Sequence, residues 1–274
     1  MPFVQLPDLR LHYRRTGSGP QPVLFLHGSF ATGRWWQPVM DLMPAGQFTG
    51  YAPDLRGCGQ SDRPDDPRGY DVERQAQDLA QLIDALGLFD LHLVGHSLGA
   101  SIALTYAATH PGRLRSLVLV STPSTVGTPT PPEGLELLAR MRGDRALLLR
   151  GLASTMPARP PDGFFQQLVD DAQDQAPAAF TANALALARW QLPDEVLARL
   201  RLPVLLVWGD RDQIVEREVQ RKLLLSLPGA NNLEVFRGAG HSPMLERTQG
   251  FVDALLDFIG QDFAGYETIR GQAG

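Results

Sequence analysis

A serine at position 97 lies in the pattern Gly95-His96-Ser97-Leu98-Gly99, which places a hydroxyl group at the tip of a sharp turn. An apolar run ends just before this pattern and a helical pattern begins just after it, so the turn joins a strand to a helix. Glycine is needed at both ends because a Cβ there would collide with the neighbouring backbone. The pattern predicts a nucleophilic serine, with the amino end of the following helix directed at the group that it attacks.

A serine that transfers acyl groups needs a base, an acid that orients the base, and donors for the developing oxyanion. His241 is the candidate base, since it lies on a glycine-containing loop between the short expected strand Leu233–Phe236 and the last helical pattern. Asp210 and Asp212 are the candidate acids and directly follow an apolar run. Either carboxylate could instead cap the next helix, and their spacing does not choose between them.

Backbone N–H groups are the candidate oxyanion donors. One belongs to Leu98, directly after the serine, and the other to the loop after Leu26, with Ser29 as first choice and Phe30 as second. His27 and His96 are interpreted as structural residues. For His96 the reason is that a side chain beside the nucleophile is expected to point away from it.

The elements that must position these residues form an α/β fold, a mostly parallel sheet covered by helices. Four apolar runs are unbroken rather than alternating, which is typical of strands buried on both faces. They are Val23–Leu26, Leu91–Val94, Leu117–Val120 and Val204–Trp208. A hairpin of residues 3–6 and 9–13 is expected at one edge of the sheet. The candidate residues all follow strands, so parallel pairing would bring them to the same edge of the sheet.

Helical patterns separate the strands. One covers residues 72–86, with Asp71 as its cap, and another covers residues 251–259. From residue 122 to about 192 the alternation of strand and helix stops, and only helical patterns remain, at 135–149, 164–172 and 178–190. The sequence therefore predicts a core domain of residues 1–121 and 193–260, a helical cap or lid of residues 122–192 over the site, and a polar tail of residues 261–274.

Composition limits the remaining function classes. The net charge is −5 and the arginines are scattered, with Lys222 as the one lysine, so neither nucleic acid nor a membrane is an expected partner. A single cysteine, Cys58, allows no disulfide within the chain. No apolar run approaches the roughly 18 residues of a membrane span, and no signal peptide is recognised, which predicts a cytoplasmic location. No metal or dinucleotide motif is present, so no metal and no cofactor is expected.

The order of these motifs resembles that of the α/β-hydrolase superfamily over about residues 10–260. The resemblance rests on His27-Gly28, the loop from Asp54 to Asp62, the serine turn, Gly209-Asp210-Arg211-Asp212 and Gly240-His241. It implies that the acid is Asp212, the second aspartate of its pattern. It also implies that the Asp54–Asp62 loop is structural, although Cys58 replaces the larger or aromatic residue often found there.

Within the superfamily, the chain looks like the small carboxylesterases and enol-lactonases. The glycine-rich loop of carbon–carbon bond hydrolases is replaced here by Ser29-Phe30-Ala31-Thr32. We expect a serine hydrolase of a small or medium ester or lactone, with Ser97, His241 and Asp212 as the triad and the Ser29 and Leu98 amides as the oxyanion hole. Carbon–carbon bond cleavage, a perhydrolase or haloperoxidase reaction, or a slow-turnover ligand receptor are the alternatives, because one fold hosts them all. The oligomeric state is left open.

Overall fold

The computed structural model describes residues 2–261 and 263, and within them the centre of the fold is an eight-stranded sheet. Its order is β1-β2-β4-β3-β5-β6-β7-β8. The strands are β1 (Phe3–Gln5), β2 (Arg10–Gly17), β3 (Gln21–Leu26), β4 (Phe48–Pro53), β5 (Leu91–His96), β6 (Leu114–Val120), β7 (Val204–Gly209) and β8 (Ala230–Phe236). The edge hairpin β1–β2 and the pair β2–β4 are antiparallel, and all other pairs are parallel. The predicted fold class, a mostly parallel sheet covered by helices, is confirmed.

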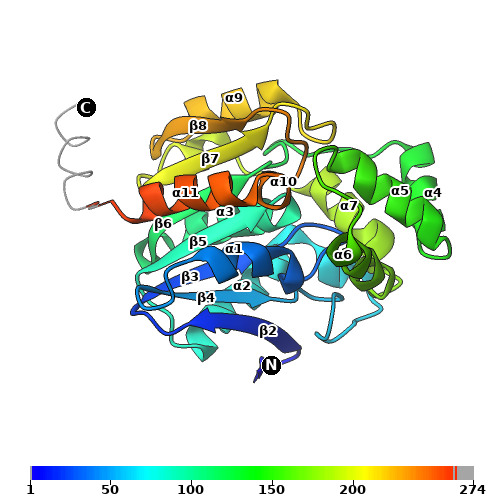
Figure 1. The fold of residues 1–274 in the computed structure, drawn as a ribbon, viewed down its shortest axis with the longest axis horizontal. Coiled ribbons are helices and arrows are strands. Elements are labelled where there is room, and N and C mark those ends of the chain that lie inside the picture. The colour runs from blue at the N-terminus through cyan, green and yellow to red at the C-terminus, as the bar shows by residue number, and fades with distance from the viewer. Residues whose placement is uncertain (1, 262, 264–274) are drawn as a thin grey trace.

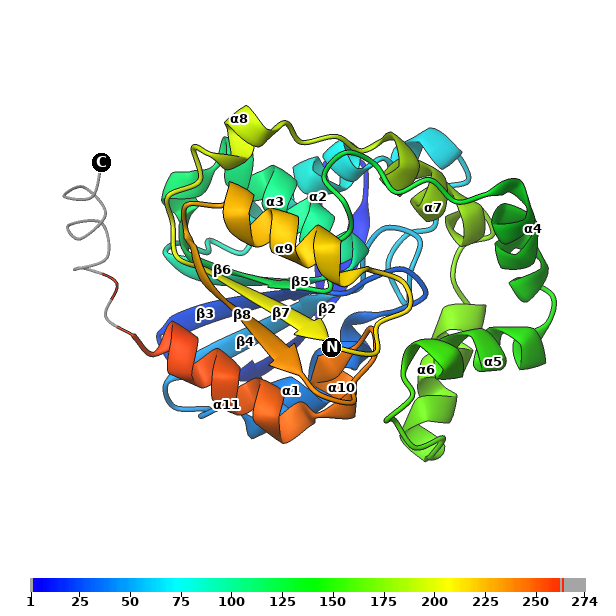
Figure 2. The same cartoon turned by 90° about the horizontal axis from the view of Figure 1, so that it is seen from above.

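Helices lie on both faces of the sheet, as Figures 1 and 2 show. One face carries α2 (Val72–Ala85), α3 (Leu98–Thr109) and α9 (Arg217–Ser226), and the other carries α1 (Gln37–Leu42), α10 (Pro243–Glu246) and α11 (Thr248–Ile259). Short 3-10 turns are η1 (Gly33–Trp36), η2 (Pro67–Tyr70) and η3 (Pro111–Arg113). No helix in the described part of the chain is both long and apolar enough to span a membrane.

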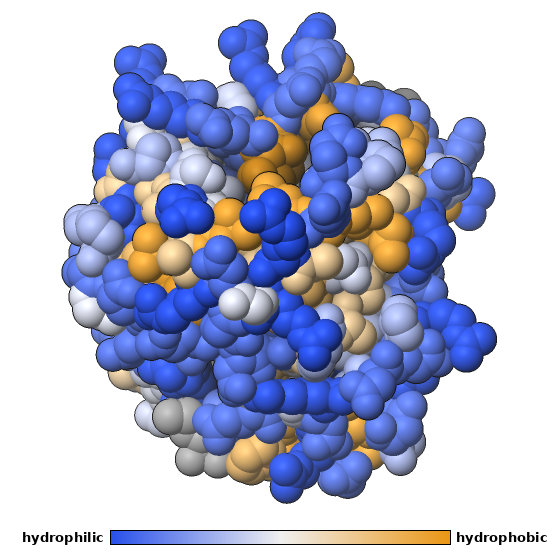
Figure 3. All heavy atoms as spheres, turned by 90° about the vertical axis from the view of Figure 1, so that its right-hand side faces the viewer, coloured by the Kyte–Doolittle hydropathy of each residue, from blue (hydrophilic) through white to orange (hydrophobic). Residues whose placement is uncertain are grey.

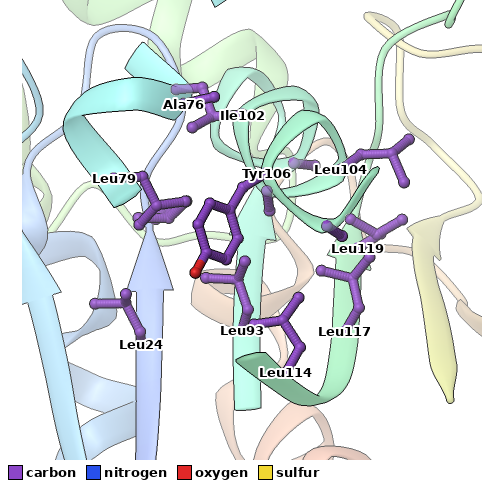
Figure 4. Close-up of a cluster of buried hydrophobic side chains, with 14 of the residues drawn as sticks. Leu24, Ala76, Leu79, Leu93, Ile102, Leu104, Tyr106, Leu114, Leu117 and Leu119 are labelled. Atoms are coloured by element: carbon purple, nitrogen blue, oxygen red, sulfur yellow. The ribbon is translucent and has the colours of Figure 1, made fainter. Parts of the chain in front are cut away.

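The unbroken apolar strands supply side chains to both layers of the core. In β3, Leu24 and Leu26 pack with α2 and α3, whereas Val23 and Phe25 pack with α1 and α11. The other parallel strands alternate in the same way, and Figure 4 shows the layer beneath α2 and α3, with Leu93 between the two helices and the sheet. Each such leucine, fully buried, stabilises the fold by roughly 1.5–3 kcal/mol.

Between β6 and β7 the chain forms helices and no strand, and most of these helices lie beyond the carboxyl ends of the strands in Figure 1. They are α4 (Pro132–Met141), α5 (Arg145–Thr155), α6 (Gly163–Gln173), α7 (Ala179–Arg189) and α8 (Asp194–Leu197). The last of them lies instead over the sheet face that carries α3 and α9, as Figure 2 shows. The single helical pattern expected at 135–149 is wrong, because α4 ends at Met141 and Asp144 caps the separate helix α5 by accepting from the Leu147 N–H at 2.9 Å. The division into domains at residues 122 and 192 stays a prediction.

Two elements were not expected from the sequence, and two further expectations differ from the structure or lie outside it. The sequence patterns do not predict strand β4 or helix α1. Asp71 precedes α2, but its side chain makes no capping hydrogen bond and pairs with Arg189 instead. The expected tail of residues 261–274 lies outside the described residues apart from residues 261 and 263.

Candidate active site

Ser97 occupies the turn between β5 and α3 in a backbone conformation that side chains rarely adopt, with φ 52° and ψ −119°. The turn requires both of its glycines. A Cβ at Gly95 would lie 2.4 Å from the Gly99 carbonyl oxygen, and a Cβ at Gly99 would lie 2.5 Å from that of Leu26. The Ser97 N–H donates to the Val120 carbonyl at 2.9 Å, so neighbouring strand β6 holds the strained residue in place.

Asp212 and His241 come together from the loops after β7 and β8. The Nδ1 of His241 lies 2.9 Å from Oδ2 of Asp212. The other carboxylate oxygen, Oδ1, accepts from the N–H groups of Ile214 and Val215 at 2.8 and 3.0 Å. Burial by itself raises the pKa of the Asp212 carboxyl, but the hydrogen bonds from His241 and the two amides outweigh it, and the pKa is lowered below its ordinary value.

Asp210, the other candidate acid, has a different partner. Its Oδ1 accepts from the N–H of Gly238 at 2.6 Å, so it joins the loop after β7 to the loop after β8. Neither aspartate caps α9, since the residue at its N-cap position is Glu216, whose side chain makes no capping bond. The geometry therefore brings His241 to Asp212.

Ser97 and His241 line one cavity of about 420 Å³, together with Ser29. Helices α4, α5 and α7 supply most of the remaining wall, which is apolar. Its larger apolar side chains are Phe30, Trp35, Leu137, Leu138, Met141, Leu148, Leu152, Leu187 and Ile214. Among the described residues, no Arg, Lys, Asp or Glu lines this cavity.

The two candidate oxyanion donors come from the start of helix α3 and from the loop after β3. Leu98 is the first residue of α3, where the N–H groups of a helix have no partner within the helix. Ser29 lies on the loop after β3. Within the described part of the chain, neither amide has an acceptor, whereas those of Ala100 and Ser101 donate to the Ser97 carbonyl. Both amides are thus free to donate to a bound ligand.

The loop that carries His241 is held by a buried carboxylate that the sequence analysis missed. Glu246 accepts from the Gly240 N–H at 2.8 Å, from Ser242 at 3.3 Å and from Ala158 at 3.0 Å. The His241 N–H donates to the Thr155 carbonyl at 2.8 Å. These bonds join the histidine loop to the last residue of α5 and to the segment that follows it. The sequence signal that could have indicated this role is the position of the glutamate, five residues after the histidine.

The expectation that His96 points away from the site is wrong. Its ring lines the cavity, lies 4.9 Å from the ring of His241 and stacks on Trp35 at 5.9 Å between ring centres. Its Nε2 lies 3.0 Å from the His241 carbonyl oxygen, which can only accept, so Nε2 carries the proton. Burial, and then the neighbouring His241, lower the pKa of His96 to about 3, and the ring is therefore neutral.

His27 lies beneath the Ser29 loop with both ring nitrogens occupied. Its Nδ1 lies 2.8 Å from the Gly28 carbonyl, and its Nε2 accepts from the Leu55 N–H at 2.9 Å. Asp54 and Arg56 are likewise buried in structural contacts, with Arg56 paired to Asp78. Burial raises the pKa of the Cys58 thiol to about 12. Among the described residues, no group of three His, Cys, Asp or Glu side chains is arranged to hold a metal ion.

Comparisons with known proteins agree with the fold described above. A family model described as alpha/beta hydrolase fold matches residues 21–248. The 2-hydroxy-6-oxononadienedioate/2-hydroxy-6-oxononatrienedioate hydrolase of Paraburkholderia phymatum is 31% identical over 272 residues, which cover 93% of this chain and 92% of that protein.

Two solved structures are also similar. An esterase from Exiguobacterium antarcticum has a TM-score of 0.84 and 25% identity, covering 94% of this chain and 99% of its own. The enol-lactonase from Burkholderia xenovorans has a TM-score of 0.82 and covers 95% of this chain and 100% of its own. At 22% identity, the second likeness concerns the fold alone.

Proposed function

Because this chain belongs to the alpha/beta hydrolase fold family, we propose that it is a serine hydrolase that cleaves a carboxylic ester or lactone through an acyl-enzyme. The observation that carries the proposal is the hydrogen bond between Asp212 and His241 beside a cavity that Ser97 also lines. The nucleophile Ser97, the orienting acid Asp212 and the base His241 follow one another along the chain in the order found in α/β-hydrolases.

In the proposed reaction, Ser97 Oγ attacks the carbonyl carbon while His241 Nε2 takes its proton. Asp212 holds the proton of His241 on Nδ1 and stabilises the imidazolium. The negative charge that forms on the carbonyl oxygen is stabilised by the N–H groups of Ser29 and Leu98. His241 then gives its proton to the leaving alkoxide, and the acyl group remains on Ser97. A water molecule, deprotonated by His241, releases the acid and restores the serine.

The cavity wall supports a neutral acyl group. Apart from the two histidines, no titratable side chain among the described residues lines it, and most of its contacts are aliphatic or aromatic. Small-molecule cavities of this size and polarity bind ligands mainly through apolar area, with a few polar groups that fix orientation. Ester and lactone carbonyls need only the oxyanion donors and the serine.

Carbon–carbon bond cleavage is the second candidate, and the 31% identical relative from Paraburkholderia phymatum favours it. The name of that relative's substrate describes a dicarboxylate. A carboxylate that is removed from water is stabilised by a cationic partner, and the described cavity wall has no Arg or Lys. This supports an ester or lactone as the substrate.

We further propose that the helices of residues 122–192 form a lid over the substrate. Helices α4, α5 and α7 contribute to the cavity wall. Asp171 on α6 accepts from Thr32 Oγ1 at 3.0 Å and from Arg34 Nε at 2.6 Å, beside the Ser29 loop. Together with the contacts of Glu246, this joins the lid both to the loop that carries Ser29 and to the loop that carries His241.

Labelling with a fluorophosphonate tests the proposal directly. We expect mass spectrometry to find one adduct, on Ser97, and none in Ser97→Ala, which should fold normally and lose kcat by roughly 10⁴- to 10⁶-fold. Hydrolysis of a graded series of p-nitrophenyl esters and lactones would follow. An adduct on another serine, or full activity in Ser97→Ala, would contradict the proposal. Product analysis with a vinylogous 1,5-diketone distinguishes carbon–carbon cleavage.

A further inference from the structure

The cavity has an exposed end and a buried end. Among its lining side chains, Leu137 is 41% exposed and Ile214 is 53% exposed. Met141 and Leu152 are each 7% exposed, and Leu148 is 1% exposed. Figure 3 looks onto the face that carries α4 and α5, where apolar atoms gather around a hollow bordered by polar residues. A leaving group can depart past Leu137 and Ile214, so the acyl group belongs at the buried end.

A glycine within helix α5 lies at this buried end. Gly151 lines the cavity, yet glycine is among the poorest helix-forming residues. A Cβ built at Gly151 would lie 2.6 Å from the terminal Cε of Met141 and 3.7 Å from its Sδ. The thioether of Met141, from α4, therefore occupies the space that any other residue at position 151 would need. Methionine is unbranched and flexible, so it can fill an irregular gap and be displaced from it.

We propose that Met141, seated on Gly151, is the end wall of the acyl pocket and sets the length of the acyl chain. The inference rests on the proposed function and specifies its substrate class, which is an ester or lactone with a neutral aliphatic acyl group. Gly151 acts indirectly, because its lack of a side chain leaves the space that the end of the Met141 side chain occupies. Met141 touches the acyl chain.

The two residues predict opposite shifts in selectivity. In Gly151→Ala the new methyl group pushes Met141 Cε into the cavity, which shortens the pocket and favours shorter acyl chains. In Met141→Ala the Cγ, Sδ and Cε atoms are lost, which lengthens the pocket and favours longer chains. Each methylene gained or lost in an apolar pocket changes kcat/KM by about tenfold or more.

The test is a double-mutant cycle on acyl-chain selectivity. We would measure kcat/KM for p-nitrophenyl esters from acetate to dodecanoate in wild type, Gly151→Ala, Met141→Ala and the double variant. Gly151→Ala should lower the ratio of long-chain to short-chain kcat/KM by about tenfold, and Met141→Ala should raise it by about tenfold. In the double variant the methyl group added at position 151 meets no methionine, so the Gly151→Ala effect should disappear.

Gly163→Ala is the matched control. Gly163 begins α6, is exposed, and has no atom within 4 Å of a built Cβ, so its variant should keep the wild-type ranking. Gly151→Ala places a better helix former in α5, so this variant is expected to fold. Its chain-length ranking therefore tests the inference even if Met141→Ala fails to fold.

Three outcomes would overturn the inference. One is an unchanged chain-length ranking in Gly151→Ala, and another is the same shift with and without Met141. If wild type hydrolyses the esters through Ser97 while either result is obtained, only this inference fails. The third outcome is that wild type hydrolyses none of the esters, in which case the proposed function fails as well.

Discussion

Replacing Asp212 with asparagine tests the arrangement of the site at a single atom. The Oδ1 of Asp212 accepts from the N–H groups of Ile214 and Val215, so an asparagine must place its carbonyl oxygen there. Its NH₂ group then faces Nδ1 of His241, where Oδ2 stood at 2.9 Å. Two donors cannot share that bond, so Nδ1 must give up its proton and become the acceptor.

The consequence is the wrong tautomer of the base. With the proton on Nε2, His241 cannot take a proton from Ser97 at neutral pH. Variants of this kind in triad enzymes lose about 10⁴-fold in kcat, which corresponds to about 5.4 kcal/mol of transition-state stabilisation. The overall fold should persist, because asparagine has the same shape as aspartate and still accepts the hydrogen bonds from the N–H groups of Ile214 and Val215.

Asp210→Asn is the matched control, since Asp210 bonds to the Gly238 N–H rather than to His241. It should change kcat by less than about tenfold, while the weakened bond lowers stability by about 1 kcal/mol. The assay is kcat for one activated ester, with circular dichroism and the extent of fluorophosphonate labelling for each variant. A larger loss in Asp210→Asn than in Asp212→Asn, or a loss below tenfold in Asp212→Asn, would refute the reasoning.

Two further predictions concern buried titratable groups. Glu246→Gln turns an NH₂ group against the N–H of Gly240 or Ala158 in either orientation, so we expect a loss of about 1–3 kcal/mol in the free energy of unfolding, measured by urea. The exposed control Glu218→Gln should change stability by less than about 0.5 kcal/mol; equal losses would contradict this interpretation. Burial lowers the pKa of His92 to about 4, so the unfolded chain binds more protons than the folded chain between about pH 6.5 and 4. The free energy of unfolding therefore decreases as the pH is lowered through that window. His92→Gln should flatten the fall by up to about 3 kcal/mol, and parallel stability curves would show that His92 is not its source.

The sheet was largely predictable because burial on both faces leaves a mark in the sequence. Val23, Leu24, Phe25 and Leu26 are all apolar, since successive side chains enter different layers of the core. Strand β4 leaves no such mark, because Phe48–Pro53 contains threonine, glycine and proline. Its pairing with β2 on one side and β3 on the other makes it a strand.

The break between α4 and α5 was missed for a different reason. Leu138, Met141 and Leu148 keep a helical spacing across the break, so periodicity alone suggests one helix. The local signal was Gly143 followed by Asp144, a pair typical of a helix end and a new cap. The periodicity of apolar residues indicates which face of a helix is buried, but it does not show whether one helix continues or a second one begins.

Some residues of the candidate site could be predicted from the sequence and others could not. Ser97 and His241 could be predicted because each lies on a loop with its own local pattern. The pattern left Asp210 and Asp212 open, and the resemblance to α/β-hydrolases chose Asp212. Glu246 and His96 were not predicted, because contacts with segments distant in sequence help to bring both of them to the site. Glu246 bonds to Ala158, and His96 lies against His241, and both pairings exist only once the loops are folded together.

Sequence likeness and the chemistry of the cavity favour different substrates. A comparison of energies favours the substrate that fits the cavity, an ester or lactone with a neutral acyl group. The relative from Paraburkholderia phymatum is named for a substrate with two carboxylates. Taking one carboxylate out of water without a partner costs several kcal/mol, and the described wall offers no Arg or Lys to either. A neutral aliphatic acyl group meets no such penalty and gains about 0.8 kcal/mol for each methylene that it buries against the apolar wall. An identity of 31% reports a shared fold and family, whereas charge in the cavity bears on the substrate, which is why the ester or lactone is the better-supported proposal.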